Sequence, residues 1–310
     1  MFRLIIPILS LSTILLASTV EALISQEPVS KLLSKHADSI GTLKQVCQEK
    51  LGPSALESLP YSNDVFFLRY CIEAEKKGDF QEQRDRLEKT LDWRTGSGKS
   101  ICDAATAAIQ QATSGGSGWS NDGVLKAAPH AATITKFVTP SNVITTTSNQ
   151  NDLVYCIRAG AIDDVSLMSQ VSIPEMVDFF LYAKEVNAQV ANLRSIDQDK
   201  VVCVITANDL AGVKLVGGSS DFRKALSQSS NQANELYPAT NGPTLLLNLP
   251  KILSALVKLF TPLFSPEVKA RLKFCQGPLS DVSDLTQVAS PASSAERAKF
   301  VKELDEIIYN

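Results

Sequence analysis

Apolar runs of strand length alternate with longer segments of helical periodicity in the second half of the chain. Four runs predict strands, and they cover residues 142–147, 153–160, 201–206 and 244–249. The third run is rich in β-branched residues, and the fourth is apolar for a strand's length and stops at Pro250. Continuous apolar runs are typical of strands that are covered on both faces. The alternation therefore predicts a domain of the α/β class.

Helices between and after these strands carry clear start signals. Ser172 and Glu175 form a capping box ahead of a long helix with an apolar face. Asp221 opens another helix, which leads into the fourth strand. Near the C-terminus, Ser293 and Glu296 form a second capping box, and the apolar residues of the helix that follows are expected to dock on the rest of the protein.

The first third of the chain, after its N-terminal leader, predicts helices. Asn63 or Asp64 caps one of them, and Asp79 caps the next. Glu82 and Arg86 are spaced as an i,i+4 ion pair in the favourable acid-first order. This part of the chain is therefore expected to form a small helical domain.

One segment is too apolar for an ordinary surface helix. Lys251–Phe264 follows the fourth strand, and its polar residues are little more than Lys251, Ser254, Lys258 and Thr261. Its apolar residues spread around the helix beyond the ~100° stripe of a surface helix. Such a helix is buried in a core, lies against a membrane or covers an apolar ligand, and periodicity alone favours the core.

The composition is that of a globular protein. Of the 310 residues, 44% are hydrophobic and 20% are charged, and the formal net charge is −3. A chain with this balance has no global basic field that would attract nucleic acid. Attraction to a membrane would have to come from local patches.

The N-terminus predicts a signal peptide over residues 1–22. Arg3 precedes the apolar run Leu4–Leu16, and small residues stand three and one before a possible cut after Ala22. This indicates the secretory pathway, with the endomembrane lumen or the extracellular space as destination. An uncleaved anchor is the alternative. Delivery to a plastid is another, because residues 23–44 could form the second half of a bipartite signal in an alga.

These patterns divide the chain into five parts. They are the signal peptide, 1–22; an N-terminal helical domain, 23–112; a Gly/Ser/Ala-rich linker, 113–133; the α/β domain, 134–280; and a C-terminal helical tail, 281–310.

The cysteine spacing argues against a disulfide framework and against a zinc site. Six cysteines occur, and none lie in a CxxC pair. Cys156 and Cys203 lie inside strand-like runs, where cysteine is usually a small buried hydrophobe. Only Cys47 and Cys71 are candidates for a bridge.

Residues for enzyme chemistry are few. His36 and His130 are the two histidines, and no G-x-S-x-G elbow accompanies them. Asp209 could act as a lone acid, although an Asp before a glycine turn is more often structural. Gly98-Lys99-Ser100 resembles part of a phosphate-binding loop, but Trp93 occupies the position of the required first glycine. We therefore expect no catalysis, no nucleotide, no cofactor and no metal.

Over about residues 60–280 the chain resembles the CRAL-TRIO lipid-binding domain. The resemblance rests on Glu235-Leu236-Tyr237-Pro238, on Asn248-Leu249-Pro250 and on the segment 259–268. Asn208–Val213 is similar to the Asp-Leu-x-Gly element of the family. That family includes phosphatidylinositol/phosphatidylcholine exchangers and the tocopherol- and retinaldehyde-binding proteins.

The resemblance implies a mixed, mostly parallel sheet flanked by helices, preceded by a small all-α domain that matches at Leu87–Arg94. In the family, the helix equivalent to Lys251–Phe264 is a gate over a lipid cavity. The resemblance implies that the cavity is lined by Tyr155, Ile205, Leu245, Leu247, Leu253, Leu256, Val257, Phe260 and Phe264.

The head-group positions depart from the pattern of the inositol-lipid binders in the family. Those proteins carry a glutamate where this chain has Ala239, and a basic residue where it has Cys71. A third basic position is kept as Arg271, and Lys269 lies close to it in sequence. The resemblance therefore implies that Lys269 and Arg271 bind the head group of the lipid, and it leaves the identity of that head group open.

The implied partner is a single hydrophobic molecule: a phospholipid, a sterol, a tocopherol or an isoprenoid. A monomer that meets a membrane surface transiently, without nucleic acid, fits this function. Two alternatives remain. The domain could be a non-catalytic scaffold for protein or membrane contacts, or the chain could be a hydrolase that depends on Asp209 and His130.

Overall fold

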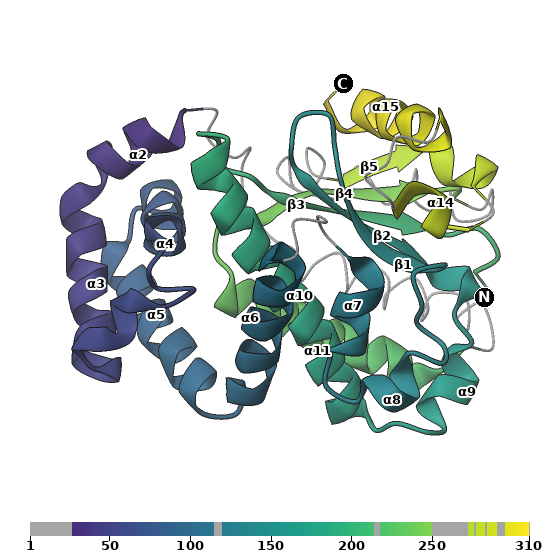
Figure 1. Cartoon of the computed structure of the whole chain (residues 1–310), viewed down its shortest axis with the longest axis horizontal. Coiled ribbons are helices and arrows are strands. Elements are labelled where there is room, and N and C mark those ends of the chain that lie inside the picture. The colour runs from purple at the N-terminus through teal and green to yellow at the C-terminus, as the bar shows by residue number, and fades with distance from the viewer. Residues whose placement is uncertain are drawn as a thin grey trace, which may run out of the picture.

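The computed structural model describes residues 27–114, 120–213, 218–249, 272–275, 277–282, 284–289 and 295–309. In this part of the chain, a group of helices stands beside a sheet that has helices on both faces (Figure 1). The predicted fold class, an α/β domain preceded by a small helical domain, is confirmed.

The helical domain forms from locally capped helices. It contains α2 (Val29–Lys35), α3 (Ala37–Leu51), the 3-10 helix η2 (Pro53–Glu57), α4 (Asp64–Lys77) and α5 (Phe80–Thr95). The next helix, α6 (Lys99–Ser114), packs instead in the core of the sheet domain through Ile101, Ala105 and Ile109. The Asn63 side chain accepts the N–H of Val65, and the Asp79 side chain accepts that of Glu82. Gly78 ends α4 in the left-handed conformation, which glycine adopts without a steric penalty. The predicted caps are therefore confirmed.

The core of this domain lies where α3, α4 and α5 meet. Phe67, Leu68, Leu87 and Leu91 have no accessible surface there. Burial of each such side chain contributes roughly 1.5–3 kcal/mol. Ala239 of the sheet domain joins the same cluster, so the two domains share a packed boundary.

The described strands form one five-stranded sheet in the order β1-β2-β3-β4-β5. They are β1 (Val143–Thr147), β2 (Leu153–Arg158), β3 (Val204–Asp209), β4 (Asn241–Leu247) and β5 (Leu272–Cys275). β1 is antiparallel to β2, and the other neighbours are parallel. The mixed, mostly parallel sheet implied by the family resemblance is therefore present.

The sequence predicts a strand over residues 201–206, but β3 begins at Val204, and most backbone groups just before it bond to side chains. The N–H of Cys203 donates to the Asp152 carboxylate at 3.0 Å, and the N–H of Val202 donates to Ser195 Oγ at 2.9 Å. The carbonyl of Val202 accepts from Arg69 at 2.8 Å. β3 starts late because these backbone groups are bonded to side chains.

Helices connect the strands. They are α7 (Asn121–Lys126), α8 (Ala131–Ile134), the 3-10 helix η3 (Ala159–Ala161), α9 (Asp164–Met168), α10 (Ile173–Asp197) and α11 (Ser220–Leu236). The capping box of Ser172 and Glu175 is confirmed at the start of α10. α11 begins one residue earlier than predicted, because Ser219 caps it by accepting the N–H of Phe222.

The segment predicted as a linker is folded over residues 121–133. α7 and α8 lie there, and Val124 and Leu125 of α7 join the main core. Asn121 extends the hydrogen bonding of the edge strand, because its amide donates to the carbonyl of Thr145 at 3.1 Å and accepts the N–H of Thr145 at 2.7 Å. This part of the chain therefore belongs to the sheet domain.

The two faces of the sheet carry different parts of the chain (Figure 1). α10 joins β2 to β3 and α11 joins β3 to β4, and both helices lie on one face. Right-handed crossovers between successive neighbouring parallel strands produce this arrangement. On the other face lie the 3-10 helix η5 (Pro278–Asp281), α14 (Thr286–Ala289) and α15 (Ala295–Tyr309).

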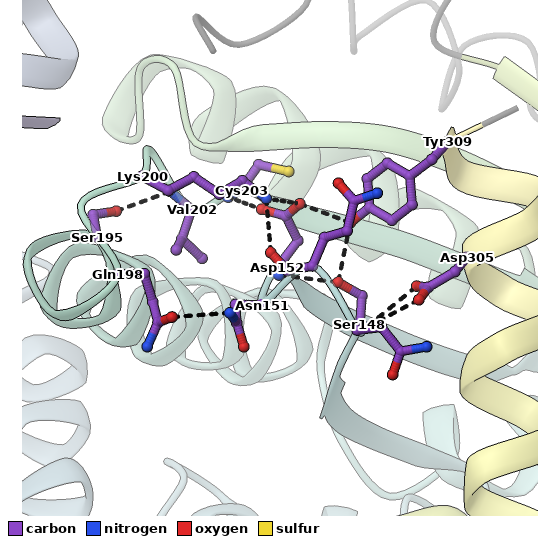
Figure 2. Close-up of polar contacts among 12 residues, drawn as sticks. Ser148, Asn151, Asp152, Ser195, Gln198, Lys200, Val202, Cys203, Asp305 and Tyr309 are labelled. Carbon is purple, nitrogen blue, oxygen red and sulfur yellow. Dashed lines mark hydrogen bonds and ion pairs between the residues drawn. The ribbon is translucent and has the colours of Figure 1, made fainter. Parts of the chain in front are cut away.

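Polar contacts fasten the end of α15 to the hairpin between β1 and β2 (Figure 2). The hydroxyl of Tyr309 donates to the Asp152 carboxylate at 2.8 Å and lies 3.0 Å from Ser148 Oγ. The Asp305 carboxylate accepts the N–H of Asn149 at 3.1 Å. These contacts locate the docking site of the C-terminal helix, which the sequence left open.

The six cysteines are free, so the possible bridge between Cys47 and Cys71 is absent. Burial raises the pKa of the Cys71 thiol to about 12 and that of Cys47 to about 11. Such thiols are inert packing groups. Among the helices that the structure describes, none combines the length and apolarity needed to cross a bilayer.

Candidate ligand-binding site

The strand register divides the predicted cavity residues between the two faces of the sheet. Tyr155 of β2 lies beside Thr206 of β3, whereas Ile205 lies beside Val154. Successive side chains of a strand point to opposite faces. Tyr155 therefore points toward α10 and α11, and Ile205 points toward the C-terminal helices, where it packs in the same cluster as Val154.

The prediction that Ile205, Leu245 and Leu247 line the cavity together with Tyr155 is corrected by this arrangement. All three have no accessible surface, and they pack with Leu279, Leu304 and other residues of the C-terminal segment. One cavity on one face of the sheet cannot be lined by both sets. The sequence does not show which side chains of β4 point to which face, because every residue from Leu245 to Leu247 is apolar. For that reason these residues were predicted to line the same cavity as Tyr155.

A row of three hydroxyl groups crosses the sheet on the face of Tyr155. Thr206 pairs with Tyr155 on one side and with Thr244 on the other. Neighbouring strands are about 4.8 Å apart, so the three side chains stand next to one another. All three are half-buried, and none of the hydroxyls hydrogen-bonds to a described residue. The row is a polar strip with free hydrogen-bonding capacity, and burial raises the pKa of Tyr155.

A mostly apolar row follows the hydroxyl row toward the C-terminal ends of the strands. It consists of Ile157, Asn208, Leu246 and Phe274, one residue from each parallel strand. Phe180 of α10 packs on Phe222 of α11 at the same face, with ring centroids 5.8 Å apart. A polar strip beside an apolar strip suits an amphipathic ligand such as a lipid.

The space beside Tyr155 is small on the β1 side. A cavity of about 20 Å³ lies there, between α7, α10, β1 and β2. Phe179, Tyr182 and Val186 fill most of this region. This part of the sheet face therefore has room for little more than a water molecule.

The remaining predicted ligand residues lie outside the described part of the chain. They are Leu253, Leu256, Val257, Phe260 and Phe264, with the head-group candidates Lys269 and Arg271. Their assignment stays a prediction.

Arginines of α4 and α5 fasten the helical domain to the sheet domain beside this site. Arg69 donates to the Asn192 side chain at 2.5 Å and to the carbonyls of Ala239 and Val202 at 2.5 and 2.8 Å. Arg94 donates to both oxygens of Glu185 at 2.8 and 2.7 Å. Arg69 thereby holds Ala239, in the turn that leads from α11 into β4, and Arg94 joins α5 to α10.

Arg86 has a different partner from the one that its sequence spacing predicts. Its guanidinium donates to the carbonyl of Glu235 at 2.7 Å and to that of Asn234. Both carbonyls belong to the last turn of α11, where they lack partners within the helix. Arg86 therefore caps α11 from another domain, and no local pattern in the sequence reveals that contact.

The two head-group positions that depart from the inositol-lipid pattern are buried in the core of the helical domain. Ala239 is 1% exposed and Cys71 is 2% exposed, and both belong to the same apolar cluster. Neither position faces the hydroxyl row, because both lie among residues of α3, α4 and α5. In this conformation a head group does not reach them.

Asp209 has a structural role. Its buried carboxylate accepts from Arg158 Nε at 3.1 Å, from the N–H of Ala211 at 2.9 Å and from the Asn248 side chain at 2.9 Å. These bonds hold together the ends of β2, β3 and β4. Asn248 adopts φ of 50°, which this contact helps to maintain.

Other candidate groups for chemistry are also occupied by structural contacts. Gly98 packs so closely on the Trp93 ring that a Cβ would lie 2.2 Å from it, which explains the glycine in the phosphate-loop-like triplet. His130 Nδ1 lies 3.5 Å from the Glu175 carboxylate, on the surface. Among the described residues, no three His, Cys, Asp or Glu side chains gather as metal ligands.

Comparison with known proteins supports the family resemblance. A family model of the CRAL/TRIO domain matches residues 140–293. Among solved structures, the chain is similar to the crystal structure of Sfh5, with a TM-score of 0.52 and 13% sequence identity. The similarity covers 89% of this chain and 98% of that chain, and at this identity it shows the fold alone. No curated protein matches the chain.

Proposed function

The chain belongs to the CRAL-TRIO family, and we propose that it binds one lipid on the Tyr155 face of its sheet and transfers or presents it at membranes. The family is one of lipid-binding and lipid-transfer proteins whose members are typically non-catalytic. A hydrophobic ligand is therefore the family-level expectation, and the finer statements below are the proposal.

The observation that carries the proposal is the contrast between the two faces of the sheet. The face of Ile205 and Leu247 is sealed by the C-terminal helices. The opposite face offers half-buried hydroxyls in one row and apolar side chains in the next. Burial of apolar groups contributes roughly 0.8 kcal/mol per methylene, so a lipid tail supplies affinity without a covalent step.

The proposal assigns the role of gate to Lys251–Phe264, on its sequence pattern and its position in the family. This segment lies in the connection from β4 to β5, which are neighbouring parallel strands. The described crossovers of this kind, through α10 and α11, both lie on the Tyr155 face. The right-handed rule leads us to expect the third connection over the same face. An apolar gate would exchange its lipid contacts for membrane contacts during transfer.

We also propose that the protein is a monomer and that its signal peptide directs it to the secretory pathway or to a plastid. A monomer delivered by residues 1–22 to the secretory pathway, or to a plastid, would carry lipid between membrane surfaces. Localisation of a C-terminally tagged chain, with and without residues 1–22, distinguishes these destinations.

The test is extraction of bound lipid from the purified chain after exposure to total membrane lipids, followed by transfer between vesicles. One stoichiometric lipid, identified by mass spectrometry, is the expected result. Leu256→Asp combined with Phe260→Asp is expected to abolish transfer. Val165→Asp combined with Ile196→Asp is the matched control, because these apolar residues are 54% and 48% exposed on the surface.

A chain that folds but carries no lipid would refute the proposal and favour the scaffold alternative. Transfer that survives the Leu256/Phe260 substitutions would refute the gate assignment alone.

A further inference from the structure

A small cavity lies at the boundary between the helical domain and the sheet domain. Its volume is about 20 Å³, which is enough for one water molecule. The helical domain contributes Tyr70 and Arg94 to its wall, and the sheet domain contributes Glu185, Asn192 and Tyr237. The cavity is therefore enclosed by both domains, and several polar side chains line it.

Two tyrosine hydroxyls of this wall have no hydrogen-bond partner among the residues that the structure describes. Tyr70 of α4 is 1% exposed, and Tyr237, which follows α11, is 8% exposed. Burial raises the pKa of Tyr70 to about 12 and that of Tyr237 well above its usual value, so both hydroxyls keep their protons. Because a buried hydroxyl without a partner is costly, such groups are nearly always bonded to protein or to an ordered water.

The neighbouring polar groups do not supply the missing bonds. Thr90 lies near Tyr70 and Glu185 lies near Tyr237, but neither comes within hydrogen-bond distance of the hydroxyl. The Thr90 hydroxyl donates instead to a backbone carbonyl of its own helix at 3.0 Å. Both oxygens of Glu185 accept hydrogen bonds from Arg94. The two tyrosines therefore need a partner from outside the protein.

A third polar group in the wall also has unused capacity. The side-chain oxygen of Asn192 accepts from Arg69 at 2.5 Å, which fixes the orientation of the amide. The amide nitrogen hydrogen-bonds to no residue that the structure describes, although Asn192 is only 5% exposed. Tyr70, Tyr237 and Asn192 thus offer three donors to a space that has the size of one water molecule.

We infer that one water molecule is bound in this cavity, where it joins Tyr70 of the helical domain to Tyr237 of the sheet domain. A buried water typically makes about three hydrogen bonds, and it can both accept and donate. The water is therefore a structural ligand that completes the domain boundary beside the ion pair of Arg94 and Glu185.

The charges and the size of the site favour water over other ligands. The Glu185 carboxylate disfavours an anion beside the Tyr237 hydroxyl, and Arg69 and Arg94 disfavour a cation. A lipid head group is far larger than a space of about 20 Å³. Water is neutral and fits the volume.

A crystal structure of the full chain, at a resolution that shows ordered water, tests the inference directly. The expected electron density has one peak within about 3.2 Å of the hydroxyl oxygens of both Tyr70 and Tyr237. Crystals grown with bromide are expected to show no anomalous signal in the cavity, because a halide does not replace the water.

Thermal unfolding gives a second readout. Tyr70→Phe and Tyr237→Phe each remove one hydroxyl and keep the ring. Each is expected to lower the melting temperature by about 2–4 °C, because a hydrogen bond to the water is lost. The double variant is expected to lose less than the sum of the two, since the first substitution already weakens the binding of the water.

Tyr182→Phe is the matched control. Tyr182 is 1% exposed, and its hydroxyl donates to the carbonyl of Val124 at 2.7 Å. Its loss is expected to add in full to that of Tyr70→Phe, because the two hydroxyls share no partner.

Three results would overturn the inference. The first is a map without a water peak that contacts both hydroxyls, or with a bromide ion in the cavity. The second is a melting temperature that stays unchanged or rises in either single variant, because removal of a hydroxyl that has no partner breaks no bond. The third is a double variant whose loss equals the sum of the single losses, since two hydroxyls that share one water are coupled.

Discussion

Arg94 of α5 and Glu185 of α10 form an ion pair with two hydrogen bonds, at 2.8 and 2.7 Å, and their side chains are only 3% and 1% exposed. The pair crosses the boundary between the helical domain and the sheet domain. Burial opposes ionisation of Glu185, but Arg94 outweighs it and keeps the pKa of this carboxyl below its usual value. The guanidinium also lies 5.6 Å from the Tyr61 ring centroid.

Removal of one partner of this ion pair is expected to destabilise the whole chain. Arg94→Met leaves the Glu185 carboxylate buried without its counter-charge, which costs about 3–5 kcal/mol. Urea unfolding of the purified variant measures the loss. The double variant Arg94→Met, Glu185→Met is the control, and it is expected to recover much of the stability because no buried charge remains. Equal losses in the single and double variants would contradict this account.

Substitutions on the two faces of the sheet are expected to have different effects. Thr206→Phe adds volume on the Tyr155 face and is expected to lower the amount of bound lipid several-fold, since the ring occupies the ligand space. Leu247→Ala removes a side chain with no accessible surface on the opposite face and is expected to cost about 2–5 kcal/mol, with unchanged lipid selectivity. Lipid extraction measures the amount and kind of bound lipid, and thermal melting measures the loss of stability.

The reverse outcome would contradict the proposal. If Leu247→Ala changed the bound lipid and Thr206→Phe left it intact, the ligand would lie on the face of Leu247 and not on the face of Tyr155.

The amino group of Lys184 on α10, whose pKa burial lowers to about 8, predicts a dependence of stability on pH. Because the folded pKa of Lys184 lies below its unfolded value of about 10.5, the folded chain binds fewer protons between pH 8 and 10.5, and its stability in the absence of lipid rises with pH in that window. Lys184→Met is expected to stabilise the lipid-free chain at pH 7 by on the order of 1–3 kcal/mol. A destabilised Lys184→Met variant in a folded, lipid-free form would contradict this prediction.

The Tyr309 hydroxyl is expected to hold the last turn of α15. Tyr309→Phe removes a donor to the buried Asp152 carboxylate and is expected to cost about 1–3 kcal/mol locally. Amide hydrogen exchange of residues 300–309 measures the effect. Lys302→Met, an exposed change on the same helix, is the control. Equal protection in both variants would mean that the apolar contacts of Phe300 and Leu304 hold the helix without this bond.

Local signals in the sequence determined most of the secondary structure. Asn63, Asp79 and Ser172 cap helices as predicted, because a capping side chain bonds to backbone two or three residues away. The class of the domain followed from the alternation of strands and helices. The long apolar connection after β4, together with its family resemblance, led to the lipid-binding prediction.

Tertiary structure decided which residues share a site. An apolar run such as Leu245–Leu247 gives no sign of which face each residue occupies, so only the register with β3 separates Thr206 and Thr244 from Ile205 and Leu247. Arg86 bonds with the carbonyls of Asn234 and Glu235, nearly 150 residues away, and its spacing from Glu82 suggested a different partner. Lys184 looks in sequence like any helical lysine. Burial lowers its pKa, and that burial comes from segments that pack on α10 only in the folded chain, so no local pattern could reveal it.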